Sequence, residues 1–122
     1  MRTIFIAMLA ILAAAFFDGV AFAHPQLQAA EPAAGSVTTP PKQIRITFNE
    51  GVIPKFSGIA IKDKTGRTVA VGKAAIDPGD KKRLVVPVLE DMAAGEYRVD
   101  WYAVSDDTHR IKGTYSFGVS HR

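Results

Sequence analysis

The sequence contains no cysteine. Disulfide bonds, thiolate zinc sites and cysteine nucleophiles are therefore excluded, and so are blue-copper centres, which need a cysteine sulfur. The chain also lacks a strong excess of one charge, because its formal net charge is +3 and the charged residues are scattered along it. Dispersed charge of this kind does not form the basic patch that nucleic acids bind, so we expect no nucleic-acid partner.

An apolar run long enough to cross a membrane as a helix is also missing. The longest run covers residues 3–17, follows a single positive charge at Arg2, and falls short of the roughly 20 residues that a transmembrane helix needs. A small-residue triplet, Ala-Phe-Ala, then ends at Ala23, as at a signal-peptide cleavage site. We therefore predict a cleaved secretory signal peptide at residues 1–23 and a single exported domain at residues 24–122, which does not insert into the membrane.

The predicted domain has little helical patterning. Apolar and polar side chains instead alternate in three segments, at residues 43–48, 96–103 and 113–119. Turns rich in Gly, Pro and Asp, such as residues 77–80, separate the predicted strands. The best helix candidate, residues 88–95, is short and is interpreted as a connection. About seven short strands at this spacing predict an all-β fold, an antiparallel two-sheet sandwich or a small Greek-key barrel.

Three histidines follow the predicted signal peptide: His24, His109 and His121. After cleavage behind Ala23, His24 becomes the first residue, and its α-amine and imidazole Nδ1 can close a six-membered chelate ring on a metal ion. Pro25 follows, and its nitrogen adds no ligand because it has no proton to lose. His121 is the penultimate residue and is interpreted as part of a solvated tail without a metal-binding role.

His109 lies two residues after Asp107, in a polar connection before the last predicted strand. If the alternation of that strand is extended backwards, both side chains point to one side, toward the interior edge, with Cα atoms roughly 6.5 to 7 Å apart. A lone Asp-x-His is also typical of a turn with a histidine at its rim. Together with the two donors of His24, the pair forms a set of three nitrogens and one oxygen. Such donors suit tetragonal Cu(II), and zinc accepts them in tetrahedral geometry, so both metals remain open.

Three segments resemble a known family. The chain has His-Pro-Gln-Leu at residues 24–27 and Ile-Thr-Phe-Asn-Glu at residues 46–50. Residues 93–119 combine a strand with a tryptophan, a Val-Ser-x-Asp-x-His connection and a Gly-x-Tyr-x-Phe strand. In these features the chain is similar to the CopC-type periplasmic copper-binding proteins, the copper resistance protein C family. It differs from many members at Gly51, where they have proline, and at Thr108, where they have glycine.

The resemblance implies a seven-stranded Greek-key β-sandwich of immunoglobulin-like type and a non-enzymatic periplasmic protein that carries or buffers copper in resistance or uptake. It implies one Cu(II) per chain, bound by the amine and imidazole of His24 with Asp107 and His109. Some members also have a methionine-rich Cu(I) site, but only Met92 follows the predicted signal here, so that site is not expected. The implied partner is an inner-membrane copper transport protein, and the expected state is a monomer.

Two other functions remain open. An N-terminal histidine chelate with a second histidine also resembles the copper brace of lytic polysaccharide monooxygenases, which are oxidative enzymes. Those enzymes need an open coordination position and a broad substrate face, whereas Asp107 would occupy that position and the predicted domain is small for such a face. The other alternative is an immunoglobulin-like interaction domain that begins with histidine by chance, and it predicts no specific Cu(II) binding.

Overall fold

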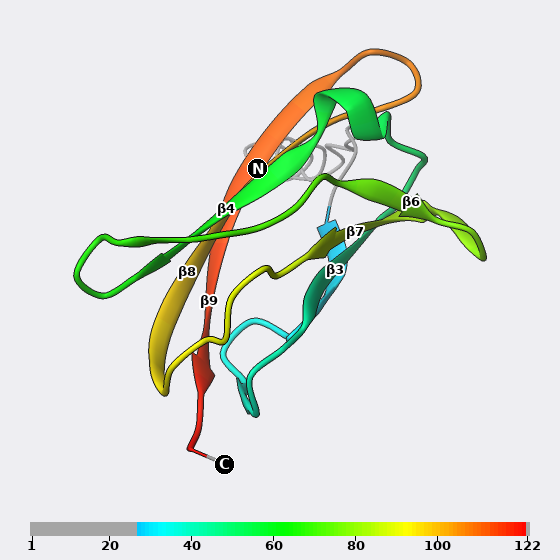
Figure 1. Ribbon diagram of the computed structural model, residues 1–122. Helices are drawn as coiled ribbons and strands as arrows, with labels where there is room; N and C mark the ends of the chain where they lie inside the picture. Colours follow the sequence, from blue (N-terminus) through cyan, green and yellow to red (C-terminus); the bar gives the residue numbers. More distant parts are fainter. Residues whose placement is uncertain (1–26, 122) are drawn as a thin grey trace, which may run out of the picture.

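The computed structural model describes residues 27–121, which form two β-sheets packed against each other (Figure 1). The first sheet holds four strands in the order β1 (Leu27–Glu31), β3 (Gln43–Phe48), β7 (Asp80–Pro87) and β6 (Ala75–Asp77). The second sheet holds five strands in the order β2 (Val37–Thr38), β9 (Arg110–Val119), β8 (Gly95–Val104), β4 (Gly58–Asp63) and β5 (Thr68–Val69). The predicted all-β sandwich is confirmed.

The described residues contain nine strands, whereas the alternation predicts about seven. The difference lies in short elements at the sheet edges, because β2 and β5 have two residues each and β6 has three. All neighbouring strands are antiparallel except β2 and β9, which run parallel over two residue pairs. No helix in the described part of the chain is long and apolar enough to span a membrane.

The core lies between the sheets and is filled from the alternating positions. The inward-facing side chains of β3 and β8 are Ile44, Ile46, Phe48, Tyr97, Val99, Trp101 and Ala103. Residues 88–94 form a connection without a helix, as predicted for residues 88–95, and Met92 from this connection is buried in the core. Period-two alternation therefore predicts the buried faces correctly where a whole strand packs on the opposite sheet.

The hairpin of β8 and β9 has ten residues in each strand and is anchored to the core by Trp101. The indole packs edge-on against Phe48, with ring centroids 5.4 Å apart. Gly113 stands opposite Trp101 on β9, where a Cβ atom would lie 2.5 Å from Trp101 Cζ2, so only glycine fits there without movement. The hairpin projects its connection, residues 105–109, at the end of the sandwich where the 3₁₀ turn η3 (Pro54–Phe56) lies (Figure 1).

Candidate functional site

The structure places two of the three predicted ligands. Asp107 and His109 lie in the connection between β8 and β9. His24 lies outside the described residues. His121, which is interpreted as part of the tail, is exposed after the end of β9.

The connection between β8 and β9 is attached to the segment that follows β3. Val52 and Ser105 form an isolated antiparallel bridge, and the Asp106 N–H donates to the carbonyl oxygen of Gly51 at 3.0 Å. The Asp106 carboxylate lies against Gly51, so a larger residue at this position would require that carboxylate to turn away. The start of the connection is therefore held in a defined position at the end of the sandwich.

Buried Ser105 forms the hydrogen bonds that hold the connection between β8 and β9 in its conformation. Its side chain is fully buried, its N–H donates to the carbonyl of His109 at 2.9 Å, and its carbonyl accepts from Thr108 at 2.8 Å. Its hydroxyl accepts the His109 N–H at 3.1 Å and donates to the Asp107 carboxylate. A search for metal-ligand residue types does not find Ser105, because serine is not among them. The sequence does indicate a structural role for it. Position 105 continues the inward-facing odd positions of β8, where a buried hydroxyl requires hydrogen-bond partners.

The side chains of Asp107 and His109 meet at the surface. His109 Nδ1 lies 3.3 Å from Asp107 Oδ2, and the side chains are 57% and 56% exposed, respectively. The expectation that both point toward the interior edge is wrong, because the chain does not stay extended between them. Thr108 has a φ of 70°, so a turn rather than strand alternation brings the two side chains together.

The Ser105 hydroxyl also lowers the pKa of the Asp107 carboxyl group. Its hydrogen bond is the largest influence on the pKa of Asp107 and holds that pKa below its usual value, and the nearby His109 imidazole acts in the same direction. Asp107 is therefore ionised throughout the pH range in which an imidazole loses its proton. The Asp107 carboxylate is then in the form that binds metal ions.

Thr108 occupies the left-handed region of backbone conformation, which a β-branched residue rarely adopts. Glycine adopts this conformation without strain. We expect Thr108→Gly to raise the free energy of unfolding by about 1 kcal/mol, which is the strain relieved less the entropy that glycine adds to the unfolded chain. Urea unfolding measures the change. Thr114→Gly on the exposed side of β9 is the matched control, with an expected loss of about 1 kcal/mol, and equal losses in both variants would contradict strain at Thr108.

Replacement of Ser105 by alanine is expected to lower the free energy of unfolding by about 1–3 kcal/mol, because the His109 N–H and the Asp107 carboxylate both lose a partner. A depressed carboxyl pKa stabilises the fold above the usual pKa, and this contribution is lost as the pH falls through the depressed value. The loss in Ser105→Ala is therefore expected to be larger near about pH 7 than near about pH 3. Urea unfolding at both pH values tests this, with exposed Ser116→Ala as the control. A loss independent of pH would contradict an interaction between the hydroxyl and the ionised carboxylate.

The pair supplies fewer ligands than a metal ion takes. Structural zinc and tetragonal Cu(II) sites have about four ligands. Among residues 27–121, no group of three or more His, Asp or Glu side chains is arranged to hold a metal ion. Further ligands of a four-ligand site built on Asp107 and His109 are therefore not His, Asp or Glu side chains of these residues.

The family model of the CopC domain matches residues 27–120, which include both sheets and the connection between β8 and β9. The chain belongs to the CopC family. The resemblance drawn from the sequence motifs is confirmed.

Known proteins match most of this chain. Copper resistance protein C of Escherichia coli is 40% identical over 119 residues, which cover 90% of this chain and 94% of that protein. The crystal structure of PcoC, a methionine-rich copper resistance protein from E. coli, matches with a TM-score of 0.71 and 41% identity over 80% of this chain and 100% of that chain. Copper transport protein CutJ of Bacillus subtilis is 29% identical over 85% of this chain, but the matched region is only 19% of CutJ.

Proposed function

We propose that this CopC-family protein is a non-enzymatic carrier or buffer of Cu(II) in the periplasm, in copper resistance or copper uptake. The observation that carries the proposal is the contact at the surface between His109 Nδ1 and Asp107 Oδ2, which are 3.3 Å apart. Two donor atoms at roughly 2.0–2.1 Å from one ion lie about 2.8–3.4 Å from each other when their angle at the metal is between square and tetrahedral. Because more than half of each side chain is exposed, an ion bound there is accessible for exchange.

The remaining donors in this proposal are the α-amine and imidazole of His24. The position of β1 supports them. Leu27 begins β1 and pairs with Phe48 at the end of β3, and Gly51, three residues later, is hydrogen-bonded to Asp106. Leu27 therefore lies at the same end of the sandwich as the connection between β8 and β9. The three residue steps from His24 to Leu27 span up to roughly 10 Å when extended, which supports the amine as a donor at this end of the sandwich.

The donor set favours Cu(II) as the cargo. Three nitrogens and a carboxylate oxygen suit tetragonal coordination, and Cu(II) has the highest affinity among the divalent first-row metals. Zinc accepts the same donors in tetrahedral geometry, so the tetragonal preference and the higher affinity of Cu(II) together favour copper in this proposal. Met92, the only methionine within residues 27–121, is buried in the core and offers no thioether to Cu(I) at the surface. We therefore propose one Cu(II) per chain and no oxidative catalysis, because Asp107 occupies the fourth position.

The proposed partner is an inner-membrane copper transport protein, which the chain serves as a monomer. The similarity to part of CutJ supports this assignment, because a domain that is joined to a transport protein in one organism can serve such a protein as a separate chain in another. The apolar run at residues 3–17, as a signal peptide cleaved after Ala23, would deliver the domain to the same compartment.

Titration of the mature protein with Cu(II), followed by electron paramagnetic resonance, tests the proposal. Mass spectrometry first confirms that the chain begins at His24. We expect one tetragonal signal with nitrogen coupling that saturates at one Cu(II) per chain. The affinity is expected to fall between about pH 8 and about pH 5, because α-amines ordinarily titrate at about 7.7–8.0 and imidazoles at about 6.5, and both bind copper only without the proton. An affinity that is independent of pH, or a spectrum equal to that of free copper, would contradict the site.

A further inference from the structure

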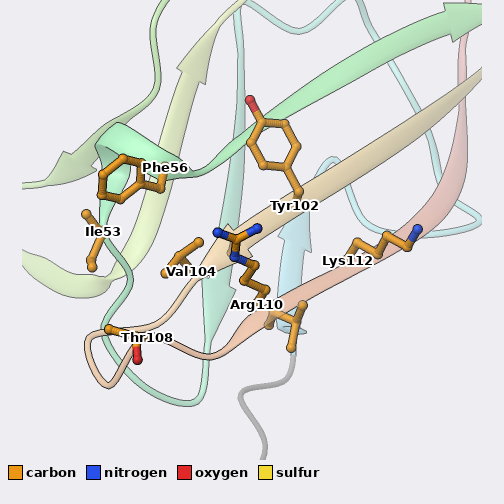
Figure 2. A pocket seen from close by; sticks show the side chains of 9 residues that line it. Ile53, Phe56, Tyr102, Val104, Thr108, Arg110 and Lys112 are labelled. Carbon is orange, nitrogen blue, oxygen red and sulfur yellow. The ribbon is translucent and has the colours of Figure 1, made fainter.

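A groove of about 770 Å³ opens on the outer face of the second sheet, beside the connection that carries the proposed copper ligands (Figure 2). Thr108, which separates Asp107 from His109, lines the groove at that end. Figure 2 shows Arg110 extending from β9 toward Tyr102 on β8. The groove therefore combines surface from both strands of the long hairpin with the tip of its connection.

Two exposed aromatic side chains form apolar walls of the groove. Phe56 from η3 is 54% exposed, and Tyr102 is 53% exposed. Gly58 on β4 makes room for the tyrosine, because a Cβ atom there would lie 2.7 Å from Tyr102 Oη. Ile53 adds an aliphatic side chain to the lining. Exposed aromatic rings beside a concave surface are typical anchor points for the side chains of a protein partner.

The charged side chains of the groove are basic. Arg110 and Lys112 line it, and Lys55 Nζ lies 5.8 Å from the ring centroid of Phe56. Within residues 27–121, no acidic side chain lines the groove, and Arg110 forms no ion pair. All the other arginines in this range pair with Asp or Glu: Arg45, Arg67, Arg83 and Arg98. The fold thus leaves one arginine available for an external carboxylate.

We propose that this groove docks an acidic segment of a protein partner, which places an apolar side chain between Phe56 and Tyr102 and carboxylates on Arg110 and Lys112. Charge complementarity selects this occupant, because an arginine without a partner binds a carboxylate through two parallel hydrogen bonds. A segment in the groove lies beside the proposed copper ligands, because Thr108 lines its end. The partner is therefore a protein that exchanges copper with this chain, a step that rests on the proposed function.

Binding of a synthetic peptide to the metal-free protein tests the docking directly. The probe is a fluorescein-labelled peptide with two leucines between pairs of glutamates. We expect its anisotropy to rise on binding, and backbone amide shifts to concentrate at residues 53–56 and 102–112. The double variant Arg110→Glu, Lys112→Glu is expected to weaken binding by about tenfold or more. The matched control is Lys81→Glu, Lys82→Glu, which makes the same change in net charge at exposed positions in β7 and is expected to change the affinity by less than about twofold.

Equal losses of peptide affinity in the two double variants would overturn the docking site, because they would show that binding depends on the net charge alone. Binding to vesicles of phosphatidylglycerol, or a dimer formed through Arg110 and Lys112, without a response to the peptide would also overturn it. Cu(II) titration of the same variants separates the two proposals. Loss of peptide binding with an unchanged copper spectrum supports the groove. Absence of copper binding in every form, with peptide binding retained, overturns the copper function and leaves the groove supported.

Discussion

One glycine placed before His24 is expected to lower the Cu(II) affinity of the mature protein by roughly 10²-fold or more. The insertion keeps every side chain but moves the free α-amine to the glycine, so the six-membered ring through the α-amine and the His24 imidazole no longer forms. Loss of a group that only supports a ligand typically weakens metal binding by about 10–100-fold, and loss of a direct ligand has at least that effect. Competition with a chelator of known affinity measures the change near about pH 7.5, where much of the amine is deprotonated.

Two histidine variants complete this experiment. His109→Ala on the native N-terminus is expected to weaken binding to a similar degree, because it removes the imidazole that contacts Asp107. His121→Ala is the matched control, since it removes an exposed histidine after β9 and is expected to leave the affinity within about twofold. Binding by the glycine-extended protein that is as tight as that of the native form and gives the same electron paramagnetic resonance spectrum would show that the amine is not a ligand. A large loss in His121→Ala would place the tail in the site.

Phe48→Ala is expected to lower the free energy of unfolding by about 3–5 kcal/mol. The Phe48 side chain is fully buried at the end of β3 and packs edge-on against Trp101, so its removal leaves a cavity beside the indole. Small domains are stable by only about 5–15 kcal/mol, so the variant should unfold at much lower urea concentration. Trp101 is the only tryptophan in the chain, and its fluorescence reports the transition.

A second phenylalanine provides the control for this core substitution. Phe56 is 54% exposed, so Phe56→Ala removes the same atoms from the surface and is expected to change the free energy of unfolding by no more than about 0.5 kcal/mol. Both variants are measured with a chelator present, because the core between the two sheets is complete without metal ligands. Equal losses in the two variants, or unfolding of the unmutated protein by the chelator, would contradict this account of the core.

The alternation of side chains predicted the strands that bury one whole face. It succeeded for β3, β8 and β9, because alternate side chains of each strand enter the core. It does not predict β1, in which only Leu27 and Ala30 are partly buried and an irregularity interrupts the pairing with β3. The position of β1 depends on backbone hydrogen bonds to β3, and these leave no pattern of side-chain types in the sequence.

For the candidate ligands too, the sequence predicted one part of the arrangement and the tertiary structure decided the rest. The residue types and spacing of Asp107 and His109 predicted that they can share an ion, and the structure brings their side chains into contact. The predicted direction was wrong, because the positive φ of Thr108 interrupts the extended chain on which the extrapolation from β9 depended. Ser105 stands outside any pattern of metal ligands, and its role became apparent from its burial and its hydrogen bonds.

The sequence by itself determined which donor atoms the chain has and which faces of its long strands are apolar, because both depend only on residue types and on their spacing between near neighbours. Only the tertiary structure decided that Asp107 and His109 meet at the surface and that Arg110 stands in an aromatic groove without a carboxylate partner. These arrangements arise where segments far apart in the chain pack together. The pairing of Val52 with Ser105 positions the connection, and the pairing of β4 with β8 places Tyr102 over Gly58. Contacts of this kind are set by backbone pairing between segments far apart in the chain rather than by local sequence.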